Sequence, residues 1–123
     1  MFYSQILPQA PGSAAAARAL IERVRAELSQ QAFDDARLLV SELVANAVEH
    51  AGTMMTVQVA RRTRHVHVAV RDGSPAEPMI SRESGLTERG RGLMLVEAVS
   101  VRWGWLPTDD GKVVWASLCE QAA

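Results

Sequence analysis

Residues 41–51 read Ser41-Glu42-Leu43-Val44-Ala45-Asn46-Ala47-Val48-Glu49-His50-Ala51. This stretch continues an apolar pattern with a helical period, which predicts a helix over about residues 35–50 that ends before Gly52. Its apolar face is formed by Ala36, Leu39, Val40, Leu43, Val44, Ala47 and Val48. Glu42 and Asn46 stand one turn apart on the flank of that face, so their side chains are expected to lie together.

The pair of Glu42 and Asn46 has two interpretations. A glutamate beside a buried stripe is suited to act as a general base, and an asparagine carbonyl oxygen suits a hydrated Mg²⁺ ion. A polar helix flank that simply faces water is the commoner origin of such a pair. The spacing alone therefore leaves both interpretations open.

The elements around this helix predict the fold class. Alternating apolar residues indicate strands over residues 2–7, 55–59, 66–70, 101–106 and 113–118. Helical spacing indicates helices over residues 13–28, about 35–50 and 93–99. Because the later strands form hairpins of neighbouring segments, the sequence predicts an α+β two-layer sandwich. Its sheet is expected to be mixed but mainly antiparallel, with helices on one face.

Length, charge and cysteine content restrict the function. The 123 residues are expected to form one domain, residues 1–123, and the net charge of −1 argues against direct nucleic-acid binding. No apolar run approaches the roughly 20 residues that span a bilayer, and the N-terminus lacks the basic segment of a secretory signal, so no membrane role is expected. Cys119 is the only cysteine, which favours a reducing, cytoplasmic location.

Two later segments can carry chemistry. Asp72 stands where a strand gives way to the long loop of residues 73–89, and it can either bond to its own turn or accept a hydrogen bond from an exocyclic amine. Gly90-Arg91-Gly92 then opens a helix, where backbone N–H groups can approach a phosphate. Arg89 and Arg91 can clamp phosphate oxygens or remain solvated, and the glycines can also be only a flexible start to the helix.

Several other side chains have structural explanations. His65 and His67 share one face of a strand, but a metal site would need a third ligand. Trp103 and Trp105 also share a face, and they pack the closing hairpin or offer a docking face to a partner. Lys112, the only lysine in the chain, follows a hairpin turn and is expected to be solvated.

The order of these segments resembles the Bergerat-type ATP-binding fold, which gyrase, histidine-kinase catalytic domains and anti-sigma-factor serine kinases share. Residues 41–51 look like the N box of that family. Val70-Arg71-Asp72-Gly73-Ser74-Pro75 looks like its first glycine box, and Gly90-Arg91-Gly92-Leu93 looks like its second. The resemblance covers about residues 10–118, with a lid over residues 75–89.

The short lid is similar to that of the small anti-sigma kinase branch. The closing hairpin, with Arg102-Trp103-Gly104 and Gly111-Lys112-Val113-Val114-Trp115, resembles that of stand-alone actinobacterial members. The sequence departs from the family pattern at three positions. Ser74 and Ala76 stand where glycines are usual, and Val113 stands where a threonine near the adenine is common.

The resemblance implies a role for each site residue. Glu42 would be the general base toward a substrate serine hydroxyl, Asn46 would hold Mg²⁺, and Asp72 would accept a hydrogen bond from the adenine amino group of ATP. The remaining nucleotide-binding positions would be Ser74, Arg89, Gly90, Arg91, Gly92 and Leu93, with the Gly90 and Gly92 amides covering the phosphates. Positioning and charge neutralisation of this kind suit phosphoryl transfer.

The resulting hypothesis is a Mg-ATP-binding anti-sigma factor with protein-serine kinase activity. Its partners would be a sigma factor and an antagonist protein, and the resemblance suggests a homodimer. One alternative is a nucleotide-binding interaction module that transfers no phosphoryl group. Another is a stand-alone catalytic partner of a histidine-kinase-like sensor system.

Overall fold

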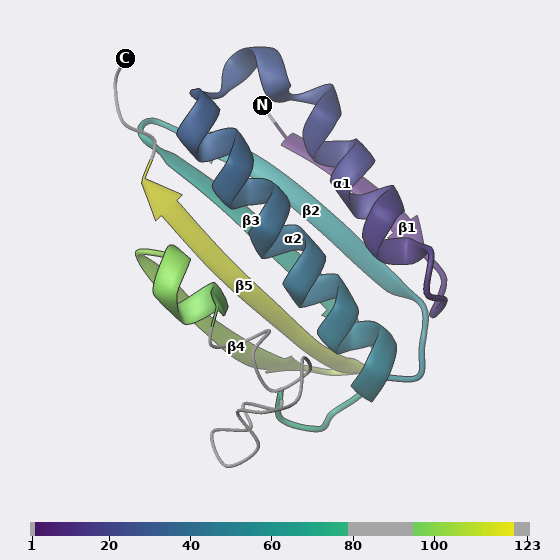
Figure 1. Cartoon of the computed structure of the whole chain (residues 1–123). Coiled ribbons are helices and arrows are strands. Elements are labelled where there is room, and N and C mark those ends of the chain that lie inside the picture. The colour runs from purple at the N-terminus through teal and green to yellow at the C-terminus, as the bar shows by residue number, and fades with distance from the viewer. Residues whose placement is uncertain (1, 79–94, 120–123) are drawn as a thin grey trace.

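In the part of the chain that the structure describes, five strands form one sheet, and the helices pack on one of its faces (Figure 1). The computed structural model describes residues 2–78 and 95–119. The strands are β1 (Phe2–Leu7), β2 (Met55–Arg62), β3 (His65–Asp72), β4 (Arg102–Thr108) and β5 (Gly111–Cys119). The helices are α1 (Ser13–Arg23) and α2 (Gln30–His50), with a 3₁₀ turn over Arg25–Glu27 and helical residues 95–99. The predicted α+β two-layer sandwich is confirmed.

The strand order across the sheet is β1-β2-β3-β5-β4. All four pairings among the described strands are antiparallel, so the sheet contains no parallel pair within that part of the chain. The hairpin of β2 and β3 closes at Thr63, whose φ is 57°. Because β3 and β5 are central neighbours, the last residue of β3 lies opposite the beginning of β5.

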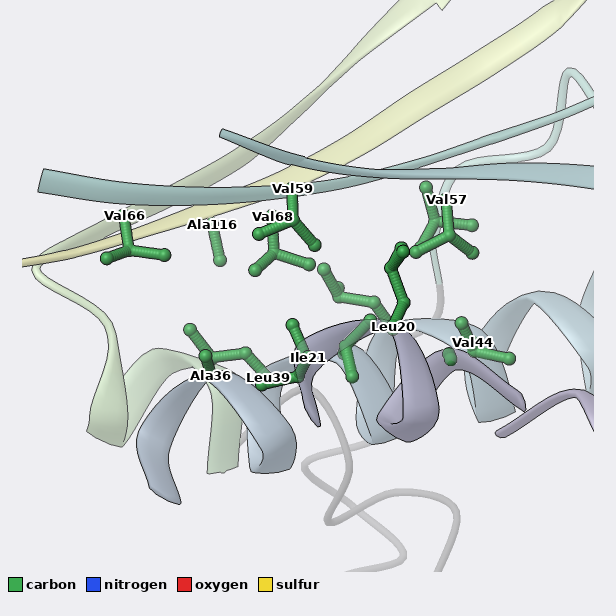
Figure 2. Packing of buried hydrophobic residues seen from close by; sticks show 14 of the residues in the cluster. Leu20, Ile21, Ala36, Leu39, Val44, Val57, Val59, Val66, Val68 and Ala116 are labelled. Atoms are coloured by element: carbon green, nitrogen blue, oxygen red, sulfur yellow. The ribbon is translucent and has the colours of Figure 1, made fainter. Parts of the chain in front are cut away.

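The hydrophobic core lies between the helices and the sheet. Figure 2 shows side chains of α1 and α2 directed toward valines on the strands. The labelled core residues are Leu20, Ile21, Ala36, Leu39, Val44, Val57, Val59, Val66, Val68 and Ala116, all of them buried. Each buried valine or leucine stabilises the fold by about 1.5–3 kcal/mol relative to an exposed one, so this layer holds α2 firmly on the sheet.

The helix boundaries differ from those predicted. Helix α2 begins at Gln30 rather than near residue 35, because the Ser29 hydroxyl caps it by accepting a hydrogen bond of 3.1 Å from the Ala32 amide. Helix α1 ends at Arg23, earlier than predicted. At the other end of α2, Gly52 has the predicted helix-ending position and a φ of 67°. No helix in the described ranges is both long and apolar enough to cross a membrane.

The tryptophans of β4 are partly buried and pack against the hydrophobic core. Trp103 and Trp105 pair with Ala116 and Val114, so they lie on the helix-covered face and pack against the core. Trp115 lies on the opposite face of the sheet, against Gly104. The structural explanation for Trp103 and Trp105 is therefore confirmed, and the docking of a partner at this face stays a prediction.

Candidate functional site

Helix α2 presents Glu42 and Asn46 from its second half. Asn46 is only 9% exposed, and its side chain forms no hydrogen bond with any described residue. Glu42 is partly buried, and this burial raises the pKa of its carboxyl above the ordinary value of 4.5. A flank that simply faces water does not explain these features. One helical turn thus combines a carboxyl that holds its proton more tightly with a largely buried asparagine whose side chain bonds to no described residue.

Asp72 ends β3 with its carboxylate buried at 4% exposure. Its Oδ1 accepts a hydrogen bond of 2.9 Å from the Ser74 amide, so the turn that was one interpretation of Asp72 is present. Its Oδ2 is buried and has no hydrogen-bond partner among the residues that the structure describes. An unpaired buried acceptor is costly, which makes this oxygen a candidate for a hydrogen bond from a ligand.

Lys112 is buried beside Asp72, at 3% exposure, so the expectation that it is solvated was wrong. Its Nζ lies 3.1 Å from Asp72 Oδ1 and 3.3 Å from the Ser74 carbonyl oxygen. The physical reason is the register, because Lys112 pairs directly with Asp72 and shares a face of β5 with Val114 and Ala116. The ammonium supplies the countercharge that the buried carboxylate requires.

The backbone around Asp72 is held by close contacts. Gly73 donates a hydrogen bond of 2.9 Å to Thr53 Oγ1, and Ser74 Oγ accepts one of 3.2 Å from the Ala76 amide. Gly111 faces Asp72 so closely that a Cβ there would come 1.9 Å from the Asp72 carbonyl oxygen. Only glycine permits this approach of β5 to β3. Ser74 stands where the family usually has glycine, and its hydroxyl takes part in this turn by accepting the bond from Ala76.

Val113 lies away from this site. It pairs with Arg71 on the sheet face opposite to Asp72 and Lys112, because successive residues of a strand point to opposite faces. The expectation that Val113 replaces a threonine near the adenine is therefore wrong for this structure. The residue that faces Asp72 from the closing hairpin is Lys112, which the sequence interpretation had left outside the site.

The expected phosphate-binding residues Arg89, Gly90, Arg91, Gly92 and Leu93 lie outside the described residues, as does the lid from residue 79 onward. Their roles stay predictions. Among the residues that the structure describes, no three His, Cys, Asp or Glu side chains are placed to hold a metal ion. Any Mg²⁺ at Asn46 would therefore need further oxygen ligands from phosphates and water, which is the usual coordination of this ion with nucleotides.

The histidines of β3 form a separate cluster on the open face of the sheet. The rings of His65 and His67 stack with centroids 6.1 Å apart, and His67 Nδ1 lies 2.5 Å from Ser117 Oγ. Burial, followed by the charges of His65 and Arg62, lowers the pKa of His67. The pair shares a face as predicted, and no third metal ligand joins it within the described ranges.

Comparisons with known proteins identify the domain family and support the fold. The family model of the histidine kinase-like ATPase domain matches residues 7–118. The chain is similar in structure to the RsbU and RsbW domains of Rv1364c from Mycobacterium tuberculosis, with a TM-score of 0.76 and 19% sequence identity. That match covers 100% of this chain and 33% of the other, so this chain spans about a third of that length. No curated protein matches the sequence.

Proposed function

This chain belongs to the histidine kinase-like ATPase domain family, and we propose that it is a Mg-ATP-dependent protein-serine kinase that acts as an anti-sigma factor. The observation that carries the proposal is the pairing on α2 of Glu42, whose pKa is raised by burial, with the buried Asn46. The likeness of the fold to an RsbW domain supports the assignment of this chain to the small regulatory branch of the family. The antagonist protein would supply the serine, and a sigma factor would be the regulated partner in the cytoplasm.

The residues present fit an adenine nucleotide and Mg²⁺. Asp72 Oδ2 is a buried acceptor without a partner within residues 2–78 and 95–119, which suits the exocyclic amine of adenine. The amide oxygen of Asn46 has no other hydrogen-bond partner in the described chain and suits Mg²⁺. When bound, Mg²⁺ would neutralise charge on the phosphates of ATP.

Glu42 performs the proton transfer in this proposal. As the serine oxygen forms its bond to the γ-phosphorus, the bond to the β,γ-bridging oxygen breaks and ADP leaves. The proton of the serine hydroxyl passes to the Glu42 carboxylate. A pKa raised by burial makes Glu42 a better proton acceptor once it is ionised, which is the property that a general base needs.

The test is transfer of radiolabelled phosphate from ATP to a candidate antagonist protein in the presence of Mg²⁺. Glu42→Gln keeps the size and polarity of the side chain but removes the base, so transfer is expected to fall about 10²- to 10⁴-fold while ATP affinity is kept. Transfer at the wild-type rate in Glu42→Gln would contradict the assignment of the base. ATP binding without any transfer by the wild type would favour the interaction-module alternative.

A further inference from the structure

We infer that Lys112 is a specificity-determining residue of the nucleotide site, which donates a hydrogen bond to a ring nitrogen of the base next to its exocyclic amine. This inference rests on the proposed nucleotide binding and adds a residue to that site. The ligand class is an aminopurine in which a donor and an acceptor stand side by side on one edge. Adenine has two such edges, N6 with N1 and N6 with N7, and the inference commits to the edge with N1.

The donor and the acceptor for such an edge are already adjacent in the protein. A lysine ammonium carries three N–H donors. Lys112 uses two of them, toward Asp72 Oδ1 and the Ser74 carbonyl oxygen, and the described residues provide no acceptor for the third. Within the same described part of the chain, Asp72 keeps Oδ2 as an acceptor without a partner. The ion pair therefore presents one spare donor and one spare acceptor from neighbouring strands.

Burial makes the pair of Lys112 and Asp72 selective for a base that fills both of its remaining hydrogen-bonding positions. Lys112 and Asp72 are 3% and 4% exposed, so water competes weakly for their remaining hydrogen-bonding positions. A base that fills both positions would satisfy Asp72 Oδ2 with its amine hydrogen and the third Lys112 N–H with its ring nitrogen. A base lacking the ring nitrogen would leave a buried ammonium N–H unsatisfied, and such a loss is expensive when the donor is charged.

The first experiment compares ATP with 1-deaza-ATP, in which N1 is replaced by a C–H group while the amine is kept. Calorimetry on the wild type is expected to show about 10- to 150-fold weaker binding of 1-deaza-ATP, the usual range for a hydrogen bond to a charged group. The matched control is 7-deaza-ATP, which alters the other edge of the ring and is expected to bind like ATP. Equal affinity for ATP and 1-deaza-ATP would overturn the inference.

The sequence allows a second, direct readout on the unmodified protein. Because Lys112 is the only lysine, ¹⁵N-lysine labelling produces one side-chain ammonium resonance in the NMR spectrum. This resonance is expected to shift on titration with ATP and to shift much less at saturation with 1-deaza-ATP. If Lys112 were only a counter-ion for Asp72, the two nucleotides would shift it equally, and the inference would be wrong.

A variant pair then assigns the effect to the side chain. Lys112→Met is expected to bind ATP and 1-deaza-ATP with the same affinity, since the donor is absent. The matched control is Arg71→Met, which removes a cation from the open face of β3, where Arg71 forms an exposed ion pair of 3.4 Å with Asp110. Arg71→Met should keep the wild-type discrimination between the two nucleotides.

The outcomes separate this inference from the proposed function. Wild-type protein that binds no ATP would refute nucleotide binding itself. Wild-type protein that binds ATP but does not discriminate against 1-deaza-ATP would refute only the role of Lys112. If Lys112→Met fails to fold, the deaza comparison and the single ammonium resonance of the wild type still decide between these results.

Discussion

Lys112 Nζ lies 3.1 Å from Asp72 Oδ1, and the two side chains face each other across paired positions of β5 and β3. Both charges lie on the helix-covered face of the sheet, among apolar side chains that include Val70, Val114 and Ala116. A register shift of one residue between these strands would move one charge to the open face and leave the other buried alone. The pair therefore favours one register at the place where the nucleotide site is expected.

Asp72→Asn is expected to destabilise the fold by about 3–5 kcal/mol, because it leaves the Lys112 ammonium buried without a countercharge. The double variant Asp72→Leu with Lys112→Met removes both charges and should recover most of that loss, since apolar replacements of a buried ion pair are often neutral or stabilising. Urea denaturation of the three proteins measures both effects. A double variant as unstable as Asp72→Asn would show that packing, and not the unpaired charge, sets the cost.

The fold could be predicted because its signals are local. The apolar stripe of α2 and the alternation of Val66, Val68 and Val70 each lie within one segment, and the hairpins are formed by neighbouring segments. The sequence predicts a later start for α2 than the structure has, because Asp34 and Asp35 resemble N-terminal helix caps. In the structure they instead bond to Gln30 and Gln31 within the first turns.

The candidate site could be predicted only in part. The spacing of Glu42 and Asn46 indicates the pair, but the burial of Asn46 depends on the sheet below it. Lys112 was missed because its partner is 40 residues away in the sequence. A signal was nevertheless present: counting back in twos from Ala116 through Val114 reaches Lys112, which places it on the buried face.

Gly104→Ala is expected to destabilise the sheet by about 1–3 kcal/mol, the usual cost of adding a methyl group to a filled space. A Cβ at Gly104 would lie 2.9 Å from Cζ2 of the Trp115 ring, so the ring must move. The control is Gly12→Ala, at a helical φ of −73° with no atom within 4 Å of the added Cβ. Equal melting temperatures of the two variants in thermal denaturation would contradict this contact.

Asn46→Ala is expected to change the stability of the fold by less than about 1 kcal/mol, because the amide has no hydrogen-bond partner among the described residues. It should, however, abolish the gain in ATP affinity that Mg²⁺ provides. Calorimetry with Mg²⁺ and with a chelator measures that gain. The control is Ser41→Ala on the same helix, which removes only the hydrogen bond of 3.1 Å that Ser41 accepts from Arg18. This variant should leave the gain in ATP affinity from Mg²⁺ intact.

Glu42→Gln is expected to stabilise the fold at neutral pH. Burial raises the pKa of Glu42 in the folded state above the value of 4.5 that serves for the unfolded chain, so the folded protein binds this proton more tightly. The free energy of unfolding therefore falls as pH rises from 4.5 through the folded-state pKa. Glutamine stays neutral throughout, so the variant should match the wild type below pH 4.5 and exceed it above.

Asp110→Asn provides a control of opposite sign. The hydrogen bond from Thr108, followed by that from Arg71, lowers the pKa of Asp110 below 3.8, so its contribution to stability is present above that pH and lost as pH falls through the folded-state value. This variant should be less stable than the wild type at neutral pH and approach it in acid. Urea denaturation from pH 3 to pH 7 measures both differences. A Glu42→Gln difference that is independent of pH would mean that burial does not raise the pKa of Glu42. Glu42 would then lack the property that suits it to act as a general base.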